Sequence, residues 1–220
     1  MSTIVVTGAN RGIGLALSEI LSKRGDDVIA IVRKSSEALD ALGVKVHTDV
    51  DVTDDEAVLS LSARLPETID AAILNAGILR SESLDNLDFD SIREQFEVNT
   101  LGPLRVSAML AHGPLKGGGK IVIVTSRMGS IEDNTSGSRY GYRMSKAAVN
   151  MAGKSLATDL KPRGVAVGLV HPGYVRTDMT GGGGHIDASE AAAGIIARMD
   201  GLSVENTGSF WHQNGESLPW

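Results

Sequence analysis

Short apolar runs alternate along the chain with longer segments whose apolar residues recur at helical spacing. The early runs are apolar at every position rather than at every second one, so they predict strands that are buried on both faces, as in a parallel sheet covered by helices. Strands are expected at Thr3–Thr7, Asp27–Val32, Val44–Val50, Ile69–Leu74, Lys120–Thr125, Val165–Val170 and Thr207–His212. Helices are expected at Ile13–Lys23, Ser35–Leu42, Asp54–Leu65 (capped by Thr53 or Asp54), Asp88–His112, Tyr140–Lys161 and Ala188–Met199.

This alternation predicts an α/β fold, a doubly wound parallel sheet of about seven strands with helices on both faces. No linker-like change in composition interrupts the pattern, so one domain spanning residues 1–220 is expected. Two glycine clusters, Gly117–Gly119 and Gly181–Gly184, are interpreted as loops. The second cluster belongs to the segment Asp178–His185, which is the expected substrate lid.

Composition narrows the classes of function. The 220 residues include 26 glycines and no cysteine, which excludes a disulfide scaffold, a thiolate metal site and a cysteine nucleophile, and is consistent with a cytoplasmic location. A net charge of −6 argues against nucleic-acid or anionic-membrane partners. No targeting or membrane-spanning segment is expected, and the five histidines are too dispersed to predict a metal site.

A glycine-rich turn joins the first strand to the first helix. Its spacing is G-x3-G-x-G, and it sits where a tight turn brings backbone amides and a helix N-terminus to a pyrophosphate, as in Rossmann-type folds. Glycine is also common in ordinary turns, so its position after the first strand adds weight to the nucleotide interpretation. The candidate cofactor residues in this turn are Thr7, Gly8, Asn10, Arg11, Gly12, Ile13 and Gly14.

The end of the second strand bears on the choice of cofactor. Arg33 stands where an acidic residue would bind a ribose 2′-hydroxyl, and an arginine there accommodates a 2′-phosphate. Arg11 could reach the same phosphate, so NADP(H) is preferred over NAD(H), although Arg33 could also be a solvated loop cation. Asp51 and Val52 are the candidates for the adenine end; Asp51 could instead cap a helix, and Asp49 competes with it for the position.

A tyrosine and a lysine four residues apart on one predicted helix provide candidate acid–base chemistry. Tyr142 and Lys146 share a helix face, and an ammonium about 4 Å from a phenol would lower its pKa from ~10 toward neutrality. Ser126 follows the fifth strand, where its hydroxyl can orient a carbonyl oxygen. Tyr140 and Ser130 are the competing candidates, but position 144, four beyond Tyr140, is Met144 rather than lysine.

Taken together, these motifs resemble the short-chain dehydrogenase/reductase family. The motifs are Thr7-Gly8-x3-Gly12-x-Gly14, Asn75-Ala76-Gly77, Asn99, Ser126, Tyr142-x3-Lys146 and Pro172-Gly173, and they cover essentially the whole chain. The segment from Tyr142 to Met151 and the ending Phe210 to Trp220 are most similar to the C-factor and Sniffer-type carbonyl reductase branch. The resemblance implies that Tyr142 is the acid–base, that Lys146 modulates it and binds the ribose, and that Ser126 orients the substrate.

The resemblance also implies roles for residues at other strand ends. Asn75, Ala76 and Gly77 would form the cofactor floor, while Pro172, Gly173, Val175 and Thr177 would face the nicotinamide and the phosphates. Pro103 lacks an N–H, so it leaves the Asn99 carbonyl without its helical partner. In the family that carbonyl holds a water in a chain that leads to the lysine.

The sequence therefore predicts an NADPH-dependent reductase of aldehydes or ketones, reversible as alcohol oxidation, with a small-molecule carbonyl or alcohol as its substrate. The alternative is a C-factor-like signalling or regulatory protein that binds NADP(H) with little turnover. A Rossmann-like methyltransferase is a third hypothesis, but it has no use for the Tyr-x3-Lys pair. The family commonly forms homodimers or homotetramers through the helices Asp88–His112 and Tyr140–Lys161, and such an oligomer is expected here.

Overall fold

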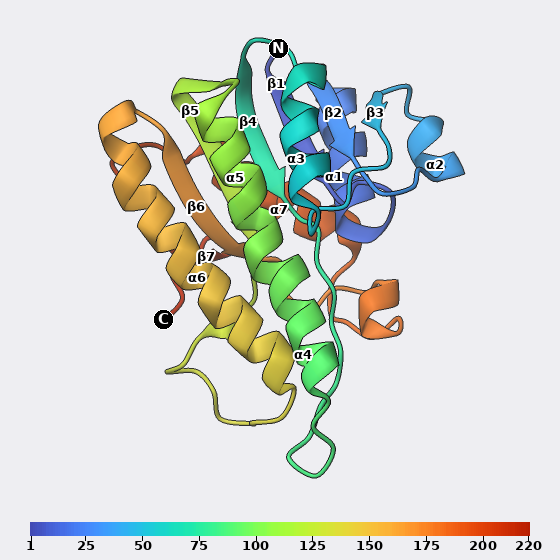
Figure 1. Ribbon diagram of the computed structural model, residues 1–220, viewed down its shortest axis with the longest axis vertical. Coiled ribbons are helices and arrows are strands. Elements are labelled where there is room, and N and C mark those ends of the chain that lie inside the picture. The colour runs from blue at the N-terminus through green and yellow to red at the C-terminus, as the bar shows by residue number, and fades with distance from the viewer.

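The computed structural model describes residues 1–220 and contains one parallel sheet of seven strands (Figure 1). The strands are β1 (Thr3–Thr7), β2 (Asp27–Ile31), β3 (Lys45–His47), β4 (Ile69–Leu74), β5 (Leu115–Val124), β6 (Ala166–His171) and β7 (Phe210–His212). Their order in the sheet is β3-β2-β1-β4-β5-β6-β7. The predicted doubly wound parallel α/β sheet is confirmed, although β3 and β7 are shorter than the apolar pattern suggested.

Helices cover both faces of the sheet. They are α1 (Gly12–Arg24), α2 (Glu37–Asp40), α3 (Asp55–Leu61), α4 (Phe89–Phe96), α5 (Gly102–His112), α6 (Tyr140–Leu160) and α7 (Ala188–Asp200). Helices α3, α5 and α6 lie over the face nearer the viewer in Figure 1, and α1 and α7 lie behind the sheet. Alternate residues of the central strands supply the two apolar cores: Val5 packs under α5 and α3, while Ile4 and Val6 pack under α1 and α7.

Two sequence-based expectations need correction. Gly117–Gly119 are part of β5 rather than a loop, because Ile69 pairs with Leu115 and Ala71 pairs with Lys120, so the intervening residues of β5 form a bulge. Gly118 has φ +89° there, a conformation that favours glycine. The expected helix Asp88–His112 consists of α4 and α5 joined by a π-helical stretch at Glu97–Leu101, just before Pro103.

The sheet reverses its winding between β1 and β4, and side-chain hydrogen bonds hold these two strand ends together. The hydroxyl of Thr7 accepts hydrogen bonds from the backbone N–H groups of Asn75 and Ala76, at 3.0 and 3.1 Å. The Asn75 amide donates back to the carbonyls of Thr7 and Gly8. In an open α/β sheet, ligands bind outside the carboxyl ends of the strands at such a reversal.

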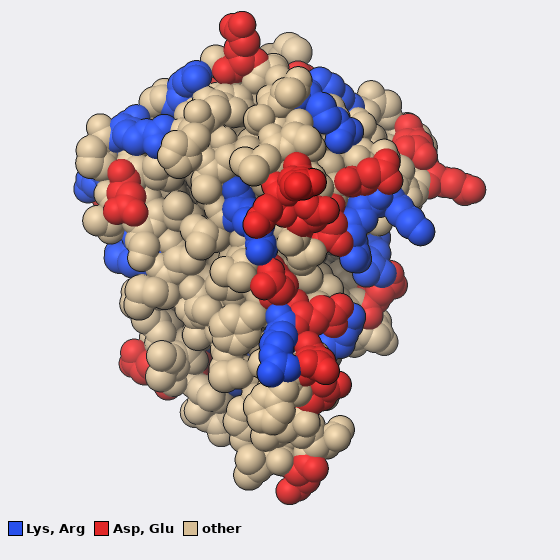
Figure 2. Space-filling view, in the orientation of Figure 1, with Lys and Arg blue, Asp and Glu red and all other residues tan.

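Acidic and basic side chains are interspersed over α3, α4 and α5 on the face shown in Figure 2, and no broad basic patch covers that face. Arg105, for example, forms ion pairs with Asp55 and Glu97. No helix combines the length and the apolar composition that a membrane crossing requires.

Candidate active site

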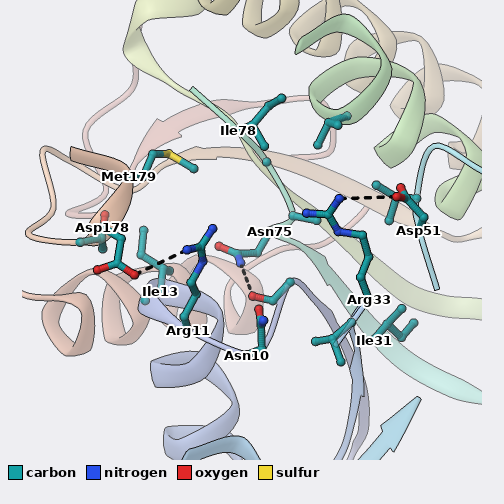
Figure 3. A pocket seen from close by; sticks show the side chains of 18 of the residues that line it. Asn10, Arg11, Ile13, Ile31, Arg33, Asp51, Asn75, Ile78, Asp178 and Met179 are labelled. Carbon is teal, nitrogen blue, oxygen red and sulfur yellow. Dashed lines mark hydrogen bonds and ion pairs between the residues drawn. The ribbon is translucent and has the colours of Figure 1, made fainter. Parts of the chain in front are cut away.

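The glycine turn forms one wall of a cavity of about 280 Å³ at the carboxyl ends of β1, β2 and β4 (Figure 3). Gly8 has φ +66°, and a Cβ there would lie 2.9 Å from the Cα of Ala76. The first turn of α1 carries no acidic side chain, and Arg11 provides no side-chain cap. The backbone N–H groups of that turn therefore remain available to an anion. The cavity lining contains most of the predicted cofactor residues: Gly8, Asn10, Arg11, Gly12, Ile13, Arg33, Asp51, Val52, Asn75, Ala76, Gly77 and Thr177.

Two arginines stand over this cavity, each paired with a carboxylate. Arg33 lies 3.6 Å from Asp51, and Arg11 lies 3.6 Å from Asp178, with Asn75 between the two arginines in Figure 3. Both arginines and Asp178 are well exposed and Asp51 is partly exposed, so these pairs contribute little stability and leave the guanidinium groups accessible to a phosphate.

Asp49 and Asp51, the competing candidates, lie differently in the turn after β3. Asp51 lines the cavity, whereas Asp49 is exposed with φ +62° and does not line it. Burial opposes ionisation of Asp51, but hydrogen bonds from the Thr53 backbone and hydroxyl, together with Arg33, hold the pKa of its carboxyl below the usual value. The N-cap of α3 is Asp54 rather than Thr53 or Asp51, because the Asp54 carboxylate accepts hydrogen bonds from the backbone N–H groups of Glu56 and Ala57.

Two predicted cofactor residues of the glycine turn, Thr7 and Gly14, lie behind the surface of the first cavity and do not line it. Thr7 is 2% exposed, and its hydroxyl is used in the β1–β4 hydrogen bonds. A Cβ on Gly14 would lie 2.1 Å from the carbonyl oxygen of Gly8, so this glycine is required by close packing of the turn on α1. Both residues therefore shape the cavity without lining it.

A second cavity, of about 370 Å³, opens beside the first at the ends of β5 and β6. Ile13, Thr177 and Met179 line both cavities, so the two form the halves of one cleft. The second half is lined by Ser126, Tyr142, Pro172, Gly173 and Val175, all predicted site residues. Tyr140 and Ser130, the competing candidates, do not line it.

The pKa of Tyr142 differs from the sequence-based expectation. Burial raises the pKa of this phenol, and the Ser126 hydroxyl and the charge of Arg139 oppose that shift only in part. The expected lowering by Lys146 does not occur, since the ammonium lies 5.8 Å from the centre of the Tyr142 ring and donates to the Val124 carbonyl at 3.1 Å. Tyr142 is therefore protonated at neutral pH and can act as a proton donor.

Lys146 is buried immediately behind the cleft. Burial lowers the pKa of its ammonium to about 8. The position that a Cβ on Gly77 would occupy is 3.7 Å from the Lys146 Nζ and 3.2 Å from the Asn99 Oδ1, so both residues meet at this glycine. The Asn99 side chain bonds to both backbone groups of Ile78 and to the Ser145 hydroxyl, which ties the π-helical stretch to the β4 end and to α6.

Sequence reasoning missed several residues of the second cavity. Asp133, Ser136, Arg139 and Arg143 line it, from the loop before α6 and its first turn. The two arginines on either side of Tyr142 in the sequence could have indicated a charged cavity. The loop conformation that brings them to it depends on contacts with distant segments, so local sequence does not predict it. Glu82 was also missed: its carboxylate is buried and accepts from Ser91, Gln95 and the Gly141 backbone, which anchors the start of α6.

His171 also lines the second cavity but is a poor acid–base candidate. Burial is the main reason that the pKa of its imidazole falls to about 3, with His212 and Arg127 adding repulsion. Its Nδ1 is buried without a hydrogen-bond partner. The ring is therefore neutral across the physiological range.

The comparison with known proteins assigns this arrangement to a family. Residues 2–185 match the family model described as short chain dehydrogenase. The chain belongs to the short-chain dehydrogenase family. This dehydrogenase is 45% identical over 227 residues, covering the whole of both chains, to 1-hydroxy-2-glutathionyl-2-methyl-3-butene dehydrogenase of Rhodococcus sp. (strain AD45). It is 42% identical over 154 residues to the C-signal protein of Myxococcus xanthus, covering 69% of this chain and 93% of the relative.

Solved structures place the dehydrogenase in the predicted branch. The carbonyl reductase Sniffer of D. melanogaster superimposes with a TM-score of 0.90 at 27% identity, over the full length of both chains. An NADPH-bound carbonyl reductase from chicken fatty liver superimposes with a TM-score of 0.89 at 27% identity, covering 100% of this chain and 99% of the other. The likeness to the C-factor and Sniffer branch is thereby confirmed.

Proposed function

We propose that this short-chain dehydrogenase is an NADP(H)-dependent reductase of aldehydes or ketones, able to run in reverse as an alcohol dehydrogenase, with Tyr142 as its acid–base. The observation that carries the proposal is the placement of Tyr142 and Ser126 in one half of a cleft whose other half carries the glycine turn. A location in the cytoplasm agrees with the absence of cysteine.

The cleft residues fit a dinucleotide phosphate. The turn is so closely packed that a Cβ at Gly8 or Gly14 would meet backbone, and two accessible arginines line the same cavity. We assign the pyrophosphate to the turn Gly8–Ile13, the 2′-phosphate to Arg11 and Arg33, and the adenine to Asp51 and Val52. When bound, the nicotinamide would supply or accept the hydride.

The residues of the chain handle the proton. Tyr142 holds a proton at neutral pH, since the pKa of a phenol already lies well above 7 and burial raises it further, so a proton is present for donation to the oxygen of a carbonyl substrate. The Ser126 hydroxyl orients the same oxygen. The Ser126 hydroxyl and the charge of Arg139 favour the phenolate that remains. We assign Lys146, behind the cleft beside Asn99, to the cofactor ribose and to the path by which the proton is replaced.

The test of the reaction is NADPH oxidation, followed by absorbance, with a panel of aldehydes and ketones. The panel should include alcohols for the reverse reaction, among them glutathione thioether alcohols, since the Rhodococcus relative is named for such a compound. Tyr142→Phe should lower kcat by at least 10²-fold, and Tyr140→Phe is the matched control two residues earlier on α6. If wild type and Tyr142→Phe are equally silent or equally active, the proposal fails.

The cofactor preference is tested separately by binding. Arg33→Gln and Arg11→Gln should each weaken NADPH binding about tenfold, with a smaller effect on NADH, because each variant removes a partner of the 2′-phosphate. Arg93→Gln on α4 is the control, since Arg93 is exposed and lies outside the cleft. Equal losses for NADPH and NADH would contradict the assignment.

The similarity to C-signal supports a second candidate, a signalling protein that binds NADP(H) with little turnover. Cofactor binding without oxidation of NADPH by any carbonyl in the panel would favour it. We also propose a homodimer or homotetramer through α4, α5 and α6, whose outer surface exposes Phe89, Leu101, Leu104, Met144 and Met151. Light scattering coupled to size exclusion would give the number of subunits.

A further inference from the structure

The charge of the substrate half of the cleft is opposite to that of the whole chain. Arg127, Arg139 and Arg143 line this cavity, and Asp133 is its only acidic residue. The chain as a whole carries a net charge of −6. A cationic cavity in an acidic protein focuses the local potential and favours an anionic ligand.

Only one of the three arginines is neutralised. Arg127 forms a two-pronged ion pair with Asp133. Arg143 donates instead to neutral acceptors: the carbonyls of Gly137, Ser138 and Met128 and the Ser136 hydroxyl. The Arg139 guanidinium makes neither a hydrogen bond nor an ion pair within the protein.

The buried carboxylate nearby does not compensate these charges. Glu82 lies behind the start of α6, where its Oε1 accepts from the Ser91 hydroxyl and the Gln95 amide, and its Oε2 accepts from the Gly141 backbone. Arg139 contacts this residue only through its own backbone N–H, which donates to the Glu82 carbonyl. Arg139 therefore has no carboxylate partner beside Tyr142, and Arg143 shares with Arg127 the single charge of Asp133.

Local structure at this point is unfavourable in three independent ways. Arg143 lies in the first turn of α6 and Arg139 immediately precedes that helix, so two like charges stand at the end where the helix dipole disfavours cations. Arg139 is the N-cap of α6 but provides no side-chain cap. Ser138 and Arg139 have φ +55° and +52°, a left-handed conformation that costs energy for residues other than glycine. Such a combination beside a reactive tyrosine indicates a binding role.

We propose that Arg139 and Arg143 form an anion subsite that binds a carboxylate on the substrate while its carbonyl or hydroxyl group reaches Tyr142. The inference rests on the proposed reductase function, since it names the substrate class of that same site. The loop Ser130–Arg139 carries the subsite: its backbone and Ser136 hold the Arg143 guanidinium, and Arg139 ends it. Arg139, Arg143 and Tyr142 line the same cavity of about 370 Å³, which places the subsite within one small molecule of the reacting group.

The test compares two probes that differ only in charge. In the kinetic arm, 4-carboxybenzaldehyde and the isosteric neutral 4-formylbenzamide are reduced with NADPH. In the binding arm, 4-(hydroxymethyl)benzoate and its amide are titrated calorimetrically without added cofactor, which makes the readout independent of turnover. Wild type should prefer the acid at least tenfold in kcat/KM and in affinity, with the preference falling as salt is added.

Arg139→Gln should erase most of this acid-over-amide ratio, because it removes a positive charge of the subsite. The variant should still fold, because the Arg139 side chain makes no internal contact. Arg139→Gly should raise the midpoint of thermal unfolding, because it relieves the left-handed conformation, while it also loses the ratio. Arg93→Gln, which removes an exposed arginine outside the cleft, should keep the ratio of wild type. Benzoate, tested alone as an inhibitor, reports whether the subsite binds a free carboxylate.

The outcomes separate the two proposals. Equal use and equal binding of acid and amide by wild type would overturn the subsite while leaving the reductase function in place. Acid-selective binding that depends on Arg139, without reduction of any carbonyl, would keep the subsite and overturn the reductase function. A ratio that survives Arg139→Gln and Arg143→Gln alike would overturn the assignment of these residues.

Discussion

At the scale of single residues, the site holds a positive charge where burial opposes it. Lys146 is 5% exposed, and its partners are the Val124 carbonyl and the Tyr142 ring rather than a carboxylate. Burial lowers the pKa of its ammonium from 10.5 to about 8. The folded protein therefore pays a cost in stability to keep this charge at neutral pH, which is typical of groups that serve catalysis.

Lys146→Met should raise the free energy of unfolding at pH 7 by about 2 kcal/mol while abolishing turnover. The sign follows from a folded-state pKa below the unfolded one: the cost is present in full below about pH 8 and is relieved between pH 8 and 10.5. The gain over wild type should shrink across that range in urea titrations. Lys154→Met, which alters an exposed lysine of α6, should show no such gain. A pH-independent difference would contradict this account.

Gly14→Ala tests the packing of the glycine turn. The new Cβ would lie 2.1 Å from the Gly8 carbonyl oxygen and 2.7 Å from the Asn75 amide, so the turn or α1 must shift. We expect a loss of at least about 3 kcal/mol in unfolding free energy and a matching loss of NADPH affinity. Gly201→Ala is the control, because its φ is −79° and its nearest contact would be 3.5 Å. Equal behaviour of the two variants would show that the turn is not tightly packed.

At the scale of elements, the π-helical stretch Glu97–Leu101 is the feature that joins the fold to the site. It directs the Asn99 side chain to Ile78 and Ser145, and it ends immediately before Gly102 and Pro103. Pro103 cannot donate a backbone hydrogen bond, so a regular α-helical bond to the Asn99 carbonyl is impossible. The irregularity therefore has a specific sequence cause.

Pro103→Ala restores a backbone donor that can bond the Asn99 carbonyl and favour a regular helix. We expect kcat for carbonyl reduction to fall about tenfold, because Asn99 would shift relative to Lys146, while thermal stability is kept or raised. Pro162→Ala, at a proline outside the cleft, is the matched control. Turnover equal to that of wild type would rule out a role for the freed carbonyl.

The order of the elements and the core of the site could be predicted from sequence because both depend on local patterns. Continuous apolar runs define the strands, and the i, i+4 spacing of Tyr142 and Lys146 places both on one helix face. Features that depend on contacts between distant segments could not be predicted. The β5 bulge at Gly117–Gly119 arises from pairing with β4, and the pKa of Tyr142 depends on how deeply α6 is buried.

At the scale of the whole molecule, the single sheet holds two apolar cores together. Val5 and Ile4 are neighbours on β1 but belong to different cores, and every central strand contributes to both in this way. Neither core can lose its helices without exposing the sheet that the other requires. We propose on this basis that residues 1–220 fold as one domain.

This proposal predicts a single cooperative unfolding transition. Trp211 packs against the core under α1 and α7, and Trp220 lies against Phe210, so fluorescence reports on one face and edge of the sheet. Far-ultraviolet circular dichroism reports on all helices. The two urea midpoints should coincide. Separate midpoints would show that the two faces unfold independently.

The ion pair between Arg11 and Asp178 connects the two ends of the cleft. Asp178 begins the turn that carries Met179, a residue common to both cavities. A phosphate bound to Arg11, as proposed above, would compete with Asp178 for the guanidinium. If binding of the dinucleotide changes the affinity for a molecule that contacts this turn, thermodynamic reciprocity requires that molecule to change the affinity for the dinucleotide by the same factor. Because both side chains are exposed, the coupling that this pair would add between the two ligands is small.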